Sequence, residues 1–268
     1  MSYGRDASKG PIFLIGTQRS GTTLLCRMMT AHPDIFIKNE VPVRSVFRPG
    51  ASRDEIQQKI SDSVERIFGQ SLKALMAAEG KSIWGLKDPE LTTYLEALKQ
   101  FLPEARFIVI TRDARAVVNS YMDNKWGLGT NAYTGALRWK AEVEKQLHFC
   151  DEYPGNTLRL RYEDLVLQQK ESLSAICEFL GVEFHESMLR HESQRGFLRQ
   201  TRENKKTFVA PDPEMTRKWK HQLTQHQIRL VDSVCGPLLE KLDYEAVSAG
   251  YRVPALLRVY YQVHQAII

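Results

Sequence analysis

The sequence predicts an α/β fold in which helices cover both faces of a central parallel β-sheet. Strand and helix signals alternate along the chain, and this alternation is typical of parallel sheets. The clearest strand, 107–111, consists of four bulky apolar residues and a threonine, as expected of a buried strand. Polar clusters follow three of the predicted strands, at 16–23, 87–89 and 112–115, where parallel α/β sheets bind their ligands.

The individual elements are predicted from apolar periodicity and from the residues that end each run. Short apolar runs predict strands at 12–15, 82–86, 107–111 and 157–162. Helical spacing predicts helices at 24–29, 54–79 and 91–101, after 115, at 133–153 and 171–180, and again from 224. His32 and Pro33 end the first helix, and residues 35–40 are interpreted as a short loop. Residues 253–261 predict a packed terminal helix, with peripheral membrane contact as the minor alternative.

Length and composition favour one domain. At 268 residues and 43% hydrophobic, the chain can bury one sizeable core. We predict a single domain over 1–268, with a core at about 11–181 where strands and helices alternate, a polar and basic segment at about 190–220 and C-terminal helices at about 224–268. The formal net charge of +5 suits an anionic ligand and does not by itself indicate nucleic acid, so no nucleic-acid partner is expected.

The chain carries four scattered cysteines, without a Cys-x-x-Cys pair: Cys26, Cys150, Cys177 and Cys235. They are interpreted as buried thiols in a reducing compartment, although one disulfide stays open. The N-terminus is short and polar, and the sequence contains neither a signal peptide nor an apolar run long enough to span a bilayer. A cytoplasmic protein is therefore predicted, and a homodimer is left open.

Residues 12–23 form a strand, a glycine loop and a helix start. The loop has the Gly-x4-Gly spacing of a phosphate-binding P-loop, yet Thr22 replaces the lysine that reaches a triphosphate. Backbone N–H groups and the helix N-terminus would surround a phosphate there. Gly21 would let the backbone approach closely, and Arg19 would add charge. The alternative is an ordinary strand–turn–helix with glycines for geometry.

A second anion site is predicted after the strand at 107–111. Arg112 follows this strand, and Ser120 lies eight residues further, about two helical turns on. Together they could hold a second phosphate. The alternative is that Arg112 pairs with Asp113 and Ser120 faces solvent. Combined with the first loop, the pair suggests a ligand with two separate phosphates.

These two segments carry a family resemblance. Residues 18–23 (Gln-Arg-Ser-Gly-Thr-Thr) resemble the 5′-phosphosulfate loop of sulfotransferases, and residues 112–120 resemble their 3′-phosphate signature. Ala-His-Pro at 31–33 and Leu-Lys-Asp-Pro at 86–89 are similar to the tyrosylprotein and glycan branch. The resemblance implies a P-loop sulfotransferase-like fold and the donor 3′-phosphoadenosine 5′-phosphosulfate (PAPS), with PAP as the product.

The resemblance also implies roles for individual residues. The 5′-phosphosulfate would be bound by Arg19, Ser20, Gly21, Thr22 and Thr23, the 3′-phosphate by Arg112 and Ser120, and the nucleotide by Tyr162. Some relatives carry an arginine four residues after the serine, where this chain has Asn124 followed by Lys125. In the basic segment, Lys205 and Lys218 are assigned to a loop that closes over the donor, because Lys218-Trp219 resembles a pair in relatives. A solvated run of charge is the alternative.

Sulfuryl transfer to a hydroxyl needs a base and cations that hold the transferring charge. By resemblance Glu40 is the predicted base, which we expect to be partly buried; an ion pair with Lys38 or Arg44 is the alternative. His32 is the rival base, but a capping role at the helix end explains it better. Lys87 is predicted to stabilise the sulfuryl group, with a salt bridge to Asp88 as the alternative. No metal is required in principle, and no cluster has the spacing of metal ligands.

The predicted activity is transfer of a sulfuryl group from PAPS to an acceptor hydroxyl by in-line displacement. The hydroxyl could belong to a sugar, a lipid, a small metabolite or a tyrosine. The acceptor would be lined by loops at 41–53, 124–133 and 196–212. Two alternatives stay open: a P-loop kinase of small molecules, and a non-catalytic protein that binds polyanions through residues 190–220.

Overall fold

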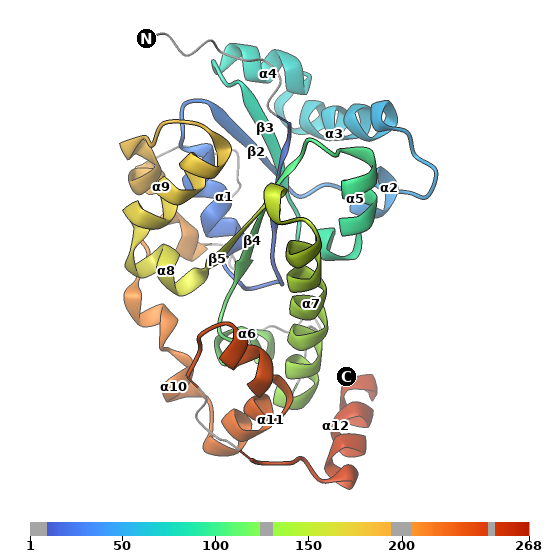
Figure 1. Ribbon diagram of the computed structural model, residues 1–268, viewed down its shortest axis with the longest axis vertical. Helices are drawn as coiled ribbons and strands as arrows, with labels where there is room; N and C mark the ends of the chain where they lie inside the picture. The colour runs from blue at the N-terminus through green and yellow to red at the C-terminus, as the bar shows by residue number, and fades with distance from the viewer. Residues whose placement is uncertain (1–9, 124–130, 194–204, 246–249, 268) are drawn as a thin grey trace.

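A computed structural model describes residues 10–123, 131–193, 205–245 and 250–267. Five parallel strands form its central sheet in the order β2-β3-β1-β4-β5 (Figure 1). The strands are β1 (Ile12–Ile15), β2 (Ile35–Asn39), β3 (Ile83–Lys87), β4 (Arg106–Thr111) and β5 (Thr157–Arg161). The predicted α/β fold with a central parallel sheet is confirmed.

Helices cover both faces of the sheet and extend beyond it (Figure 1). They are α1 (Thr22–Thr30), α2 (Val43–Val46), α3 (Arg53–Phe68), α4 (Leu72–Ala78), α5 (Leu95–Phe101), α6 (Ala114–Met122), α7 (Ala132–Glu152), α8 (Tyr162–Leu167), α9 (Gln169–Leu180), α10 (Trp219–Gln222), α11 (Gln225–Lys241) and α12 (Ala255–Ile267). Short 3-10 helices are η1 (Pro89–Thr93), η2 (Pro154–Asn156), η3 (Glu186–Ser193), η4 (Lys205–Phe208) and η5 (Pro213–Thr216).

Alternation along the buried strands divides the core into two layers, because successive side chains of a strand point to opposite faces. Ile12 and Leu14 of β1 pack with α1, α8 and α9. Phe13 packs instead on the layer formed by α3, α5 and α7, where its ring stacks on Phe107 of β4 at 5.6 Å. The central strands β1, β3 and β4 are therefore almost entirely buried, and their carboxyl ends lie at one edge of the sheet.

Strand β2 was not predicted, since residues 35–40 read as a loop. Ile35, Phe36 and Ile37 are buried, and the segment pairs with β3 in a register that places Asn39 opposite Lys87. Its apolar run is only three residues long before Lys38 and Asn39, so its local signal is weaker than that of β1 or β4. Its consequence is functional, because Glu40 follows a strand end and not a free loop.

The long helix predicted over 54–79 is in fact two helices. Helix α3 ends at Gly69, which adopts the left-handed conformation at φ 71° and donates its N–H to the carbonyl of Glu65. Ser71 then begins α4 by accepting the N–H of Ala74. The apolar periodicity continues across the break, which explains why it read as a single helix. Likewise, the helix predicted at 91–101 is η1 followed by α5.

The C-terminal helices form a separate apolar cluster in which α11 packs against α6 and α7. Helix α12 contacts this cluster through Leu257 and Tyr261, whereas Leu256 is 86% exposed, so the predicted packing of the terminal helix holds for one face only. All four cysteines are buried free thiols, in line with the prediction. Every helix within the described ranges is too short or too polar to cross a lipid bilayer.

Candidate active site

The carboxyl ends of four neighbouring strands bring the predicted site residues to one edge of the sheet. The glycine loop follows β1, Glu40 follows β2, Lys87 ends β3, and Arg112 follows β4. Helices α1 and α6 begin at this edge, and the first N–H groups of a helix have no partner within the helix. Their N-termini add partial positive charge, which favours an anion.

Ser20 fixes the conformation of the glycine loop through hydrogen bonds to Thr17. Ser20 is fully buried, and both its N–H and its hydroxyl donate to the carbonyl of Thr17, at 3.1 and 2.7 Å. Its hydroxyl therefore closes the turn, while Thr22 is buried and Thr23 half-buried at the helix start. Arg19 has a φ of 69°, a left-handed conformation that costs a non-glycine residue about 1–2 kcal/mol. Such strain persists only where the surrounding structure holds it.

Both glycines of the loop are required by close packing. Gly21 has a φ of 102°, and a Cβ built on it would lie 2.3 Å from the ring of Tyr162. A Cβ on Gly16 would lie 2.6 Å from Ser20 Oγ and 2.7 Å from the carbonyl oxygen of Ile110. The loop is therefore pressed between β4 and the start of α8.

Gly21→Ala is expected to destabilise the protein and to weaken PAP binding at least tenfold, because the new methyl group displaces the Tyr162 ring. The matched control is Gly80→Ala, where φ is 66° and nothing lies within 4 Å of the new Cβ. The control should lose about 1 kcal/mol from backbone strain alone and keep its PAP affinity. Thermal melts and calorimetric titration measure both effects; equal PAP affinity in the two variants would contradict the expectation.

Arg112 lies at the centre of the site. Its guanidinium stacks on the ring of Tyr162 at 4.1 Å and donates to the carbonyl oxygens of Arg19, at 3.2 Å, and of Met215, at 2.7 Å. Arg112 Nε is buried and has no hydrogen-bond partner in the part of the chain that the structure describes. The alternative in which Arg112 pairs with Asp113 is wrong, because Asp113 pairs with another arginine.

Ser120 joins the two predicted phosphate sites. Its Oγ accepts a hydrogen bond of 2.8 Å from Arg19 Nε, across 101 residues of sequence. Arg19, Arg112, Ser120 and Tyr162 thus form one cluster around the mouth of the glycine loop. This proximity could not be read from the sequence.

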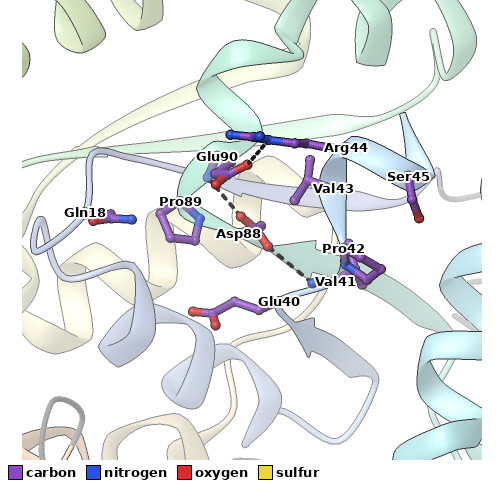
Figure 2. A pocket seen from close by; sticks show the side chains of 10 residues that line it. All are labelled: Gln18, Glu40, Val41, Pro42, Val43, Arg44, Ser45, Asp88, Pro89 and Glu90. Atoms are coloured by element: carbon purple, nitrogen blue, oxygen red, sulfur yellow. Dashed lines mark hydrogen bonds and ion pairs between the residues drawn. The ribbon is translucent and has the colours of Figure 1, made fainter. Parts of the chain in front are cut away.

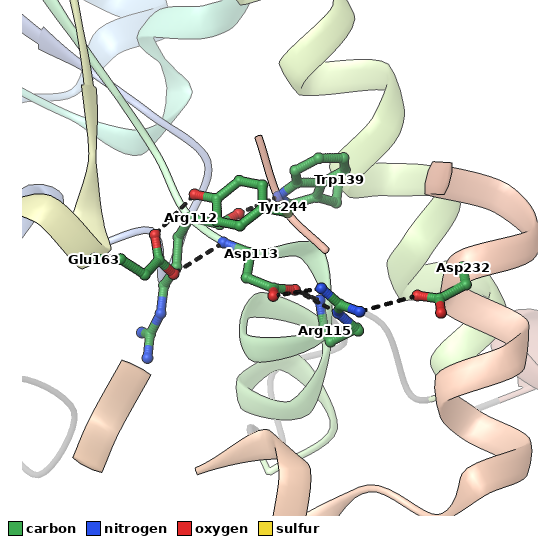
Figure 3. A network of polar contacts seen from close by, with 7 residues as sticks. All are labelled: Arg112, Asp113, Arg115, Trp139, Glu163, Asp232 and Tyr244. Atoms are coloured by element: carbon green, nitrogen blue, oxygen red, sulfur yellow. Dashed lines mark hydrogen bonds and ion pairs between the residues drawn. The ribbon is translucent and has the colours of Figure 1, made fainter. Parts of the chain in front are cut away.

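The peptide that follows Arg112 is held at both ends (Figure 3). Trp139 Nε1 donates to the carbonyl oxygen of Arg112 at 3.1 Å, and the N–H of Asp113 donates to Glu163 Oε1 at 3.2 Å. The second carboxylate oxygen of Glu163 accepts from the hydroxyl of Tyr244 at 2.8 Å. Burial raises the pKa of Glu163. Sequence reasoning missed this role, although Glu163 directly follows the predicted Tyr162.

A buried ion triad fixes the start of α6 (Figure 3). Arg115 makes a bidentate contact with Asp113, at 2.9 and 2.8 Å, and lies 3.6 Å from Asp232 of α11. Burial disfavours the charge on Arg115, but the hydrogen bonds and charges of its two carboxylate partners raise its pKa overall. Trp219 covers the guanidinium at 4.3 Å. The triad and the Trp219 ring therefore tie α6, α11 and the start of α10 together.

Glu40 and Lys87 form an ion pair at the ends of β2 and β3. Lys87 Nζ lies 2.8 Å from Glu40 Oε1, with the lysine side chain 2% exposed and the glutamate side chain 56% exposed. The expected partial burial of Glu40 is therefore wrong, and so are the alternative partners. Lys38 donates to backbone carbonyls, and Arg44 lies near Glu90.

An open pocket of about 520 Å³ lies beside Glu40 (Figure 2). Its walls come from the ends of β2 and β3, from the turn before α2 and from η1. The lining residues are Gln18, Glu40, Val41, Pro42, Val43, Arg44, Ser45, Asp88, Pro89 and Glu90. Part of the loop predicted to face the acceptor, 41–53, thus lies next to the predicted base.

His32 is buried and has a structural role. Its Nδ1 accepts the N–H of Asp34 at 3.0 Å, which leaves Nε2 to donate to the carbonyl of Glu183 at 2.8 Å. Burial lowers the pKa of His32. The capping interpretation therefore describes this residue better than a catalytic one.

The predicted cap is described in part. The backbone of Lys205 lies in η4, which contacts α1, where the Arg27 guanidinium covers the Phe208 ring at 3.8 Å. Lys218 is half-buried and directly precedes the anchored Trp219. Asn124, Lys125 and the loops at 124–130 and 196–204 lie outside the described residues. No group of three or more His, Cys, Asp or Glu side chains could hold a metal ion within the described ranges.

Known proteins resemble this chain in sequence over most of its length. A profile of the sulfotransferase family matches residues 11–186. Protein-tyrosine sulfotransferase 1 of Danio rerio is 28% identical, over 87% of this chain and 72% of that protein. Protein-tyrosine sulfotransferase A of Caenorhabditis elegans is 27% identical, over 87% of this chain and 67% of that protein.

Solved structures share the fold. The sulfotransferase domain from the curacin biosynthetic pathway superimposes with a TM-score of 0.68 at 20% identity, covering 88% of this chain and 98% of that domain. Mouse sulfotransferase SULT7A1, complexed with PAP, has a TM-score of 0.52 at 17% identity, covering 98% of this chain and 91% of that one. Since the family profile spans the glycine loop, Glu40, Lys87, Arg112 and Tyr162, the chain belongs to the sulfotransferase family of enzymes.

Proposed function

We propose that this enzyme transfers a sulfuryl group from PAPS to an acceptor hydroxyl, with Glu40 as the general base and Lys87 as the cation at the transferring group. The observation that carries the proposal is the geometry of one sheet edge. Arg19 and Arg112 gather cations and N–H groups at this edge. The ion pair of Glu40 with Lys87 lies at the same edge, beside an open pocket. The first group suits a donor with two phosphates, and the second suits proton removal.

The residues around the glycine loop suit this donor. Arg112 Nε is a buried donor without a partner among the described residues, and any Cβ at Gly16 or Gly21 would fill the loop's cradle. Arg19 and the N–H groups of 20–23 would hold the 5′ end, together with the Thr22 and Thr23 hydroxyls. Arg112 and Ser120 would hold the 3′-phosphate, and Tyr162 the nucleotide. Mouse sulfotransferase SULT7A1, which shares the fold, is complexed with PAP, in keeping with a donor of this class.

PAPS supplies a sulfuryl group whose S–O bond to the 5′-phosphate breaks as the acceptor oxygen bonds to sulfur. Glu40 would take the hydroxyl proton on its exposed carboxylate. The protonated carboxyl is neutral, so the Lys87 ammonium at 2.8 Å loses its counterion while negative charge moves through the site. Because Lys87 is buried, its charge is weakly screened and acts strongly on the transferring group.

A tyrosine hydroxyl is the acceptor to test first, among the sugar, lipid and metabolite hydroxyls that the sequence also allows. The curated relatives are protein-tyrosine sulfotransferases. The pocket beside Glu40 is open to solvent, which suits a hydroxyl presented by a larger molecule. The cytoplasmic location, the homodimer, the single domain and the donor contacts of Lys205 and Lys218 stay predictions.

Arg112→Ala is expected to weaken binding of PAP about ten- to hundredfold, as for the loss of a hydrogen-bonded charge pair, and to change binding of adenosine 5′-phosphate far less. The two ligands differ only in the 3′-phosphate, so their comparison isolates the contact. Calorimetric titration of both ligands measures it. Equal losses for the two ligands would assign Arg112 to structure instead.

Activity is tested with sulfur-labelled PAPS and a panel of acceptors comprising a tyrosine peptide, a glycan, a sterol and a simple phenol. Transfer of label to any hydroxyl supports the proposed reaction and identifies the acceptor class. Magnesium-dependent turnover of ATP would favour the kinase alternative. Tight binding of heparin without any PAP affinity would favour the polyanion-binding alternative.

A further inference from the structure

We propose that Asp88 is a positioning residue of this reaction, which holds the peptide after Glu40 and thereby aims the base. The inference rests on the proposed function, in which Glu40 takes the acceptor proton. Asp88 directly follows Lys87 in sequence and is buried, with 6% of its surface exposed. In Figure 2 its carboxylate lies between the Glu40 turn and η1.

The backbone of Glu40 needs external support. Its φ is 54°, and only Arg19 and Asp243 share a left-handed conformation among the non-glycine residues that the structure describes. A glutamate has no intrinsic preference for this conformation, so contacts outside the residue must stabilise it. Two of these three residues lie in the candidate active site.

The peptide between Glu40 and Val41 is held at both ends. Its carbonyl oxygen accepts from Lys38 Nζ at 2.5 Å, and its N–H donates to Asp88 Oδ2 at 3.2 Å. On the other side, the N–H of Glu40 donates to the carbonyl of Lys87 at 2.7 Å and continues the pairing of β2 with β3. The turn is thus fixed at the residue that carries the proposed base.

Capping of η1 uses only one of the two carboxylate oxygens of Asp88. Oδ1 accepts the N–H of Glu90 at 2.9 Å, which satisfies the start of the 3-10 helix. Asp212 caps η5 in the same Asp-Pro-Glu pattern, with Oδ1 accepting the N–H of Glu214 at 2.9 Å. The contact from Asp88 Oδ2 to the Glu40 turn is therefore an addition to an ordinary cap.

The charge on Asp88 is sensitive to pH. Burial raises its pKa to about 6, against the opposing hydrogen bonds from Glu90 and Val41. Glu40 raises this pKa further, whereas Lys87 lowers it. Lys38, Glu90 and Arg44 are further charged groups nearby. Protonation below this pH turns the carboxylate into a neutral carboxyl group, which accepts the Val41 N–H more weakly, so the Glu40 turn should loosen as the pH falls through about 6.

Asp88→Asn tests this role with little change in shape. The asparagine oxygen can still cap η1, but its amide then faces the Val41 N–H with a second donor. We expect kcat to fall about ten- to hundredfold, with PAP affinity within about twofold of wild type. We expect the wild-type enzyme to lose kcat as the pH falls through about 6, and this loss to be smaller in the variant. The control Ser71→Ala, which removes the side-chain cap of α4 away from the pocket, should keep its kcat.

A double-mutant cycle with Glu40→Gln separates the two proposals. If Asp88 acts through Glu40, Asp88→Asn has no further effect on kcat in the Glu40→Gln background. The positioning role would be overturned if the two substitutions lowered kcat independently, so that their effects multiplied. It would also be overturned if Asp88→Asn kept the wild-type kcat or lost kcat near pH 6 as the wild type does. A wild-type kcat in Glu40→Gln alone would instead overturn the proposed base.

Discussion

Glu40→Gln is expected to lower kcat about 10²- to 10⁴-fold, the range over which a positioned general base contributes. Glutamine has the shape of glutamate but cannot take the acceptor proton. Its side-chain oxygen can still accept from Lys87, which lies 2.8 Å from Glu40 Oε1, so the buried ammonium keeps a partner. The affinity for PAP should stay within about twofold, because the donor residues lie on other strands.

Single-turnover transfer of labelled sulfate measures the first effect, and calorimetric titration of PAP measures the second. Glu96→Gln is the control, since this exposed carboxylate on α5 does not line the pocket. The control should keep its kcat. A Glu40→Gln enzyme that turns over at the wild-type rate would remove Glu40 from the mechanism.

Arg115→Met is expected to lower the free energy of unfolding by about 3–5 kcal/mol, as for the loss of one partner from a buried ion pair. Arg115 contacts Asp113 and Asp232, and all three side chains are at most 8% exposed. Methionine fills part of the volume but leaves two buried carboxylates without their cation. The start of α6 should then loosen, and PAP affinity should fall with it.

Urea denaturation followed by circular dichroism measures this loss. Lys140→Met is the control, because Lys140 pairs with Glu144 at 3.7 Å on the exposed side of α7 and such pairs contribute less than about 0.5 kcal/mol. A loss in Arg115→Met no larger than in the control would show that the triad does not support α6. If the double variant Arg115→Met with Asp232→Asn regained part of the lost stability, the loss would be assigned to buried carboxylate charge that Arg115 no longer balances.

The sequence by itself determined the fold class and the donor side of the site. Strand β1, the glycine loop and the start of α1 are contiguous, so a local pattern contains the whole phosphate cradle. Arg112 was found for the same reason, since it follows a strand whose apolar run is unmistakable. Local patterns suffice wherever neighbouring residues build the feature.

Only the tertiary structure decided how the acceptor side is assembled. The pairing of β2 with β3 brings Glu40 to Lys87 across 47 residues, and Asp88 to the peptide after Glu40. The contact of Arg19 with Ser120 and the burial of Arg115 beside Asp232 depend in the same way on how distant elements pack. Sheet register and helix packing set these distances, and neither leaves a periodic signal in the chain. The sequence therefore identified the donor loop and its strands, whereas the packing of the strands determined that Lys87 and Asp88 contact Glu40 and the peptide after it.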